Sequence, residues 1–304
     1  MGAEEQNRDQ AEKLRSLVNI GNQPAEKPPV SRVITVTSGK GGVGKSNTAI
    51  NLAIQFSKRG KKVIILDADL GLANIEVMFG TVPKHSLYDV IKNGMDIKDV
   101  ITPGPLDIGF ISGGSGIADM ANLSRAELET IVNNLSKLDA MSDVVIIDTG
   151  AGISDTVMEF LLSSSEIVLV TTPEPASITD SYSLLKALCR NKHYHPGNSA
   201  IRFIGNKVKN EKEGKELFAK LNAVVKRYLE MDINYLGSVP FDNRLEKAVM
   251  QQKPVSIGDP EAKSTLAYEM LAASLLGDEV EVRHESRGIT ALFARMVRFG
   301  KRGE

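Results

Sequence analysis

The most constraining feature of this chain is the stretch 38–46, which has the sequence SGKGGVGKS. From Gly39 onward it fits the phosphate-loop pattern G-x-x-x-x-G-K-[ST]. An apolar, β-branched segment, 33–37, precedes the loop, and residues 47–58 carry apolar side chains at helical spacing. A strand, a glycine loop and a helix in this order predict a phosphate site. Backbone N–H groups and the positive end of the helix dipole then face the anion.

Two side chains of the loop supply the chemistry of a nucleoside triphosphate site. We expect Lys45 to contact the terminal phosphates and the Ser46 hydroxyl to bind Mg²⁺. The alternative is a glycine-rich turn that binds no ligand. Lys45 and Ser46 stand at the positions that the motif requires, and the expected strand and helix flank the loop, which argues against this alternative. The residues expected to contact the nucleotide here are Gly39, Lys40, Gly41, Gly42, Val43, Gly44, Lys45, Ser46 and Asn47.

Strand and helix patterns alternate after the loop and predict the fold class. Mostly continuous apolar runs predict strands at 33–38, 62–67, 107–112, 143–148, 166–172, 201–206 and 235–239. Helical periodicity predicts helices at 45–58, 86–93, 124–138, 154–163, 177–191, 211–229, 243–250 and 260–276. This alternation predicts a doubly wound α/β domain over 31–277, with a mostly parallel sheet and helices on both faces. Ligands of such domains bind at the carboxyl ends of the strands.

Three aspartates stand at predicted strand ends, where a buried acid is costly unless something uses it. Asp67 and Asp69 close the strand at 62–67, and Asp148 closes the strand at 143–148. An acid at the end of a hydrophobic strand, in a chain with a phosphate loop, is the Walker B arrangement. It predicts that Asp148 meets Mg²⁺, usually through water. For Asp69, a polar turn with helix-capping acids is the alternative.

Composition limits the classes of function. The chain has 304 residues, 25% of them charged, and a formal net charge of −1, which fits one large domain with extra arms and gives no reason to expect nucleic acid binding. A single cysteine, Cys189, excludes an internal disulfide framework and a four-cysteine metal site, and its apolar neighbours predict a buried thiol. The sequence has no apolar run of about eighteen residues, which argues against a membrane span, and its N-terminus is polar, which argues against a signal peptide. We therefore expect a cytoplasmic protein.

Two arms flank the predicted domain. Residues 1–30 combine a short helical pattern with a proline-containing linker, and residues 278–304 combine a charged connector with a basic amphipathic helix. Such a terminal helix is typical of membrane-surface binding, and docking on the protein's own core is the alternative; both states can alternate with the nucleotide. The residues expected to face the membrane are Ile289, Leu292, Phe293, Met296 and Val297 on the apolar stripe, with Arg295 and Arg298 beside it.

Lys40, Gly41 and Gly42 make the loop resemble the KGGxGK[ST] signature of the MinD/ParA deviant Walker A ATPases, which position division sites, chromosomes and flagella. The resemblance covers residues 33–276 and implies a P-loop NTPase that hydrolyses ATP to ADP. It implies a homodimer formed with ATP, in which Lys40 reaches the partner's nucleotide. It also implies that Asp69 orients the attacking water. The implied catalytic set is Lys40, Lys45 and Asp69, and the implied metal set is Ser46, Asp67 and Asp148.

Other segments carry the same resemblance. Asn206 stands where the family contacts adenine, and Pro240 and Asp242 belong to a G-x-[VI]-P turn that flanks the base. Asn74 ends a GLxN segment that contacts the dimer partner in this family. Lys209 stands where a guanine-specific NKxD site needs an acid, which favours ATP.

The loop after Asp148 resembles the family's switch II, but it departs from the pattern at one point. Thr149-Gly150 stands where many relatives have Ser-Pro or Thr-Pro, so we expect a looser loop.

The N-terminal arm resembles the DQAxxLR activator motif of the flagellar number regulators called FlhG, FleN or YlxH. The matching residues are Asp9, Gln10, Ala11, Leu14 and Arg15. In that family the arm stimulates a flagellar GTPase of the signal-recognition-particle type. This implies control of flagellar number, with that GTPase and flagellar C-ring components as partners. It also implies a cytoplasmic protein that binds the inner face of the cell membrane reversibly.

Three related functions remain as alternatives. A division-site MinD shares the domain and the tail, although no activator arm is expected there. A ParA-like partition ATPase would bind DNA, but the apolar side of the tail suits lipid better, so nucleic acid is not an expected partner. The single cysteine, Cys189, counts against an iron–sulfur carrier.

Overall fold

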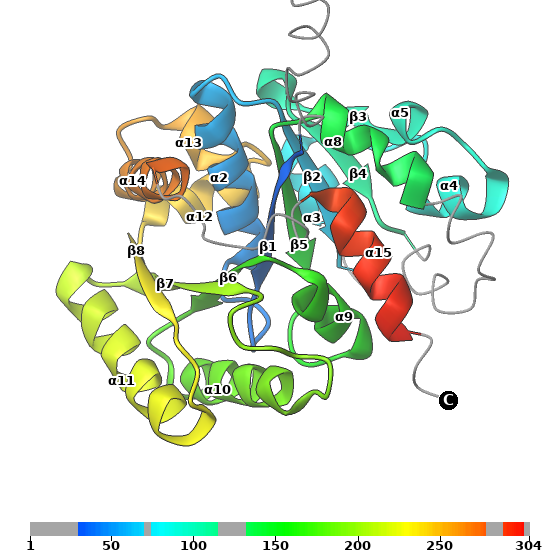
Figure 1. Cartoon of the computed structure of the whole chain (residues 1–304). Coiled ribbons are helices and arrows are strands. Elements are labelled where there is room, and N and C mark those ends of the chain that lie inside the picture. The colour runs from blue at the N-terminus through cyan, green and yellow to red at the C-terminus, as the bar shows by residue number, and fades with distance from the viewer. Residues whose placement is uncertain (1–29, 70–73, 115–131, 278–287, 301–304) are drawn as a thin grey trace, which may run out of the picture.

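The computed structural model describes residues 30–69, 74–114, 132–277 and 288–300. Within these ranges eight strands form one sheet in the order β3-β4-β2-β5-β1-β6-β7-β8 (Figure 1). The strands are β1 (Arg32–Thr37), β2 (Val63–Ala68), β3 (Thr102–Pro103), β4 (Gly109–Ser112), β5 (Val144–Thr149), β6 (Glu166–Thr171), β7 (Ala200–Val208) and β8 (Asn234–Pro240). All neighbouring pairs are parallel except β3 and β4, which confirms the doubly wound α/β fold.

The helices of the described residues cover both faces of this sheet. They are α2 (Lys45–Lys58), α3 (Asn74–Phe79), α4 (Leu87–Asn93), α5 (Ile97–Val100), α8 (Lys137–Met141), α9 (Asp155–Ser163), α10 (Pro175–Arg190), α11 (Glu211–Leu229), α12 (Asn243–Met250), α13 (Val255–Gly258), α14 (Lys263–Gly277) and α15 (Ile289–Gly300), with a 3₁₀ turn η1 (Pro105–Asp107). Among these residues no helix is both long enough and apolar enough to cross a bilayer.

Each predicted strand is present, and the elements missing from the prediction are short. Strand β3 has two residues, and helices α5 and α13 have four each, which is too few to show a period. The six-residue helix α3 was likewise not predicted. Most of the predicted helix 124–138 lies outside the described residues, and its described end continues through α8 to Met141, three residues farther than expected.

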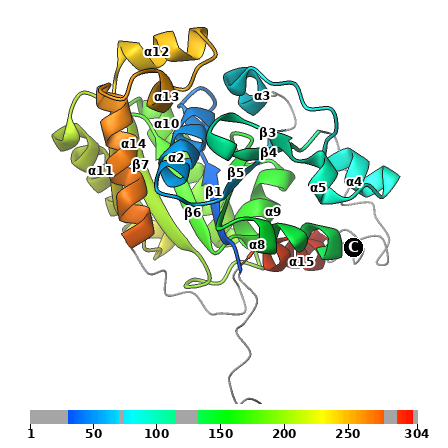
Figure 2. The same cartoon turned by 90° about the horizontal axis from the view of Figure 1, so that it is seen from above.

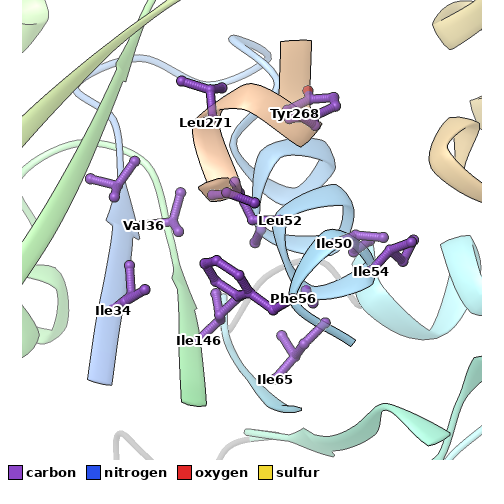
Figure 3. Close-up of a cluster of buried hydrophobic side chains, with 14 of the residues drawn as sticks. Ile34, Val36, Ile50, Leu52, Ile54, Phe56, Ile65, Ile146, Tyr268 and Leu271 are labelled. Atoms are coloured by element: carbon purple, nitrogen blue, oxygen red, sulfur yellow. The ribbon is translucent and has the colours of Figure 1, made fainter. Parts of the chain in front are cut away.

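Strands β2, β5 and β6 are buried along their whole length because successive side chains enter opposite layers. Ile34 and Val36 of β1 join a core cluster with α2 and α14, as Figure 3 shows. Val33, between Arg32 and Ile34 in the chain, belongs to the cluster on the other face, which includes residues of α8, α9 and α15. The C-terminal helix α15 is therefore part of the domain's packing and lies beside α8 and α9 (Figure 2).

The order of the strands decides where a ligand can bind. Strand β1 lies at the centre, between β5 and β6. The chain runs from β1 toward β2 on one side and later from β5 past β1 to β6 on the other side. Ligands bind at such a reversal, beyond the carboxyl ends of the strands. The glycine loop that follows β1 lies at this point.

Candidate functional site

The loop between β1 and α2 has the backbone of a phosphate cradle. Gly42 and Gly44 have φ values of 76° and 91°, in the left-handed region that favours glycine. A Cβ on Gly44 would lie 2.4 Å from Asn206 Nδ2, whereas a Cβ on Gly41 or Gly42 would meet nothing within 4 Å. The loop is thus packed on one side and open on the other, as a backbone that wraps phosphate oxygens requires.

Lys45 and Asp148 form the buried centre of the site. Lys45 Nζ donates to Asp148 Oδ1 at 3.0 Å, and both side chains are almost wholly buried. Burial raises the pKa of Asp148, against the lowering effect of the Lys45 ammonium. The other oxygen, Asp148 Oδ2, is buried and accepts no hydrogen bond within the described residues. An oxygen left in this way next to an open loop fits a carboxylate that serves a hydrated cation.

The other two predicted acids lie against Asp148. Asp67 pairs with Asp148 in the register of β2 and β5. Burial, followed by the negative charge of Asp148, raises the pKa of Asp67 to about 7. The Asp67 carboxylate accepts the backbone N–H of Asp69 at 3.1 Å and that of Ile75 at 3.4 Å. A Cβ on Gly150 would lie 3.8 Å from Asp69 Oδ1, so Asp69 adjoins the loop after β5.

The residues of this centre fit Mg²⁺ bound together with a triphosphate. The described residues contain no group of three or more His, Cys, Asp or Glu side chains that could hold a metal by itself. Mg²⁺ typically takes one or two carboxylates and completes its shell with water and substrate phosphates. Asp148 beside an open glycine loop offers that kind of partial site, and Ser46 is the second residue of α2, next to Lys45.

The segment from Thr149 to Gly152, predicted to be switch II, is tied to β1 and to the start of the glycine loop. The Thr149 hydroxyl contacts the Val36 carbonyl and the Thr37 hydroxyl, each at 3.2 Å. The Gly152 N–H donates to the Ser38 carbonyl at 3.0 Å. These hydrogen bonds hold both ends of the segment that was expected to be loose.

Asn206, expected at the base, contacts the loop itself. Its side chain is 1% exposed, and Nδ2 donates to the Val43 carbonyl at 2.7 Å. The next residue, Lys207, has a left-handed φ of 56°, and its Nζ donates to the Gly42 carbonyl at 3.1 Å. Strand β7 therefore holds two carbonyls of the loop. With its carbonyls held from this side, the loop can turn its N–H groups toward a phosphate.

The G-x-[VI]-P turn joins β8 to α12. Pro240 pairs with Val208 at the end of the sheet. Asp242 caps two helices, because its carboxylate accepts the N–H of Arg244 at 2.9 Å and both the N–H and the hydroxyl of Ser264, at 3.0 and 2.9 Å. These contacts engage both oxygens of Asp242, so its contact with a base stays a prediction.

The side chains of the two lysines in the loop lie in different environments. Lys45 is buried on Asp148, whereas Lys40 is 35% exposed and forms an ion pair with Glu174 Oε2. Glu174 stands just before α10, three residues past the end of β6, and is itself 57% exposed. Its pKa is lowered by the hydrogen bond from Lys40 and by the charges of Lys40 and Lys207. Glu174 was not predicted, although the rule that found the aspartates, an acid after a strand end, also points to it.

The C-terminal helix α15 is docked on the domain. Its apolar side chains Ile289, Leu292, Phe293 and Met296 are 0–5% exposed. Phe293 meets Phe160 of α9 edge to face, with ring centroids 6.3 Å apart. The side chains of Val297 and Arg298 lie outside the described part, and Arg295 is partly buried, which lowers its pKa.

Asp139 of α8 supplies the N-terminal cap of α15. Its carboxylate accepts the N–H of Ile289 at 2.9 Å, the N–H of Thr290 at 3.2 Å and the Thr290 hydroxyl. The same carboxylate accepts the hydroxyl of Ser31 at 2.6 Å and its N–H at 3.3 Å. One acid thus joins the start of the sheet to the start of the terminal helix. Nothing local in the sequence identified this residue.

Three predicted features have other outcomes. The motif from Asp9 to Arg15 lies outside the described residues. Asn74 starts α3, and the next residue, Ile75, donates its N–H to Asp67. Cys189 was expected to be buried but is only partly so, since the buried side chains of α10 include its neighbour Leu188 but not Cys189 itself; its Sγ donates to the Leu229 carbonyl at 3.4 Å.

Comparisons of the sequence and of the fold with known proteins find relatives of one family. The ParA family model, described as NUBPL iron-transfer P-loop NTPase, matches residues 29–276. The chain is 39% identical to the antiactivator FleN of Pseudomonas aeruginosa, over 79% of this chain and 85% of FleN. It is 32% identical to the flagellum site-determining protein YlxH of Helicobacter pylori, over 96% of this chain and 99% of YlxH. Its fold matches that of the septum site-determining protein MinD complexed with Mg-ADP from Pyrococcus horikoshii, with a TM-score of 0.63 and 23% identity, over 81% of this chain and 96% of that one.

Proposed function

Because the chain belongs to the ParA/MinD family of P-loop ATPases, we propose that it is an ATP-driven switch that regulates the number or placement of flagella. The observation that carries the proposal is that the two lysines of the loop have different environments. Lys45 is buried on Asp148, where a chain's own nucleotide would bind, and Lys40 lies at the surface, where a second subunit can approach. Similarity to FleN and YlxH supports the flagellar role.

The chain's own residues suit the binding and hydrolysis of ATP. The open side of the loop at Gly41 and Gly42 would take the phosphates, with Lys45 as the counter-charge. Ser46 and Asp148, supported by Asp67, would hold Mg²⁺, which when bound neutralises phosphate charge. Asp69 would orient the attacking water. Rate enhancement then comes from the placement of positive charge at the phosphates.

Dimerisation would complete the site. Lys40 of each subunit would contact the phosphates bound by the other, so the interface would be self-complementary about a two-fold axis. Asn74, at the start of α3, would contact the partner. Since both chains donate the same lysine, neither site would be complete without the other.

The terminal helix would couple this dimer to a membrane. In the described structure its apolar face is buried on the domain, so a lipid-binding state requires release. Basic residues near an anionic leaflet contribute about 1 kcal/mol each, so one short helix binds weakly. Two helices in one dimer bind with a far higher avidity. ATP would thereby control whether the protein is in the cytoplasm or on the inner face of the membrane.

The N-terminal arm would carry the output. Residues 9–15 match an activator motif, which makes a flagellar GTPase of the signal-recognition-particle type the expected partner. Flagellar C-ring components are further proposed partners. Iron transfer, named in the family description, is disfavoured because the chain has one cysteine.

Two measurements test the proposal. Sedimentation with and without ATP should give a dimer only with ATP, and a chain that remains monomeric would refute the switch. A pull-down with residues 1–30 as bait should capture the flagellar GTPase, and adding the same segment to that GTPase should stimulate its GTP hydrolysis. A full chain that binds DNA in a salt-dependent manner, and neither lipid nor the GTPase, would favour a ParA-like partition ATPase instead. A division-site MinD would bind lipid without stimulating the GTPase.

A further inference from the structure

We propose that Glu174 is a positioning residue that holds Lys40 within its own chain and so sets the nucleotide concentration at which two chains join. The inference rests on the proposed function, in which Lys40 acts on the partner's nucleotide. Its basis is the ion pair between Lys40 Nζ and Glu174 Oε2 at the mouth of the glycine loop. One ammonium group cannot both pair with Glu174 and reach across an interface, so the two contacts compete.

The pair connects two rigid supports. A Cβ on Gly39 would lie 2.2 Å from the carbonyl carbon of Asp180, so the loop packs directly on the backbone of α10. The Ser38 hydroxyl donates to the Lys40 carbonyl at 2.9 Å and fixes the backbone there. Glu174 caps the start of α10 through its backbone, with no side-chain capping bond. Only the two side chains therefore need to move when the pair opens.

A second lysine keeps Glu174 suited to this role. Lys207, held on the Gly42 carbonyl, adds positive charge that lowers the pKa of Glu174 along with Lys40. Glu174 is thus ionised at neutral pH, and protonation does not open the pair. What opens it is a stronger anion for Lys40, and the phosphates of a second subunit supply one.

The size of the effect follows from exposure. Both side chains are partly open to water, and an ion pair of this kind shifts an equilibrium by only about two- to fivefold. Pairing with Glu174 would lower, by that factor, the fraction of chains whose Lys40 is available to a second subunit. The apparent affinity of the two chains for each other would fall as a result. Glu174 therefore adjusts the threshold for dimerisation and does not block it.

The test is Glu174→Gln, which removes the charge and keeps the shape. Dimer formation is measured by analytical ultracentrifugation against a non-hydrolysable ATP analogue. We expect half-maximal dimerisation at about two- to fivefold less analogue, with unchanged affinity of the monomer for a fluorescent analogue and an unchanged melting temperature. Glu174→Asp, which keeps the charge, should behave more like the unaltered chain.

The matched control is Glu216→Gln. Glu216 is also 57% exposed and pairs with Lys212 at 3.9 Å, but it lies on α11, outside the loop. This control should leave dimerisation unchanged. If Glu174→Gln dimerises no more readily than the unaltered chain, or less readily because Glu174 serves the dimer, the inference is wrong and the proposed function stands. If the unaltered chain does not dimerise with the analogue, both are wrong.

Discussion

Replacing Asp139 by alanine should increase the fraction of chains whose C-terminal helix is released in the absence of nucleotide. Asp139 accepts both free N–H groups of Ile289 and Thr290, and the Thr290 hydroxyl, in the first turn of α15. Loss of a capping side chain typically costs about 0.5–2 kcal/mol. Loss of a negative charge at a helix N-terminus costs about 0.3–1 kcal/mol more. Together these terms weaken docking by about 1–3 kcal/mol, which is roughly a 5- to 150-fold shift toward the released helix.

The apolar face of the helix keeps this shift from being complete. Four side chains of α15 are 0–5% exposed in the docked state. Burial of one such side chain contributes about 1.5–3 kcal/mol, so the stripe contributes at most about 6–12 kcal/mol. The variant should therefore stay mostly docked and folded, with a larger released fraction that vesicles can capture.

The assay is co-sedimentation with vesicles of phosphatidylglycerol and phosphatidylcholine in the absence of nucleotide. Asp139→Ala should bind at least fivefold more than the unaltered chain, and removal of residues 288–304 should abolish the gain. Asp143→Ala is the matched control, because Asp143 also accepts a backbone N–H, from Lys62 at 2.7 Å, but does not cap α15. Ser31→Ala controls for the second partner of Asp139. Equal vesicle binding by the Asp139 and Asp143 variants would refute the capping argument.

Three further predictions concern the nucleotide site. Asp69→Asn should lower ATP turnover by at least about 100-fold while ATP still induces dimers, measured by phosphate release and sedimentation; normal turnover would remove Asp69 from catalysis. Gly39→Ala should destabilise the domain by more than 2 kcal/mol in urea unfolding, since its Cβ would lie 2.2 Å from the backbone of α10, whereas Gly41→Ala, with nothing within 4 Å, should fold normally. Because the pKa of Asp67 rises from 3.8 to about 7 on folding, its contribution to stability is full below pH 3.8 and is lost as the pH rises through 7. Asp67→Asn should therefore stabilise the nucleotide-free chain at pH 8 by up to about 4 kcal/mol and have little effect near pH 4; equal effects at both would contradict the shift.

Local sequence determined most of the secondary structure and the centre of the site. The pattern from Gly39 to Ser46 fixed the loop, since left-handed glycines and a following helix are encoded within a few residues. The apolar runs at 62–67 and 143–148 located Asp67 and Asp148 at strand ends. The short elements β3, α5 and α13 left no such signal, because two to four residues do not complete a period.

Tertiary structure decided how those pieces meet. Lys40 and Glu174 are 134 residues apart in the chain, and Asp139 and Ile289 are 150 apart. Amphipathicity predicted an apolar face on the terminal helix, but the same stripe suits lipid and protein equally. Only the packing of α15 against α8 and α9 in the folded domain decided that it docks here. Sequence periodicity encodes which side of an element is apolar, whereas the order of strands in the sheet determines which distant side chains that side will contact.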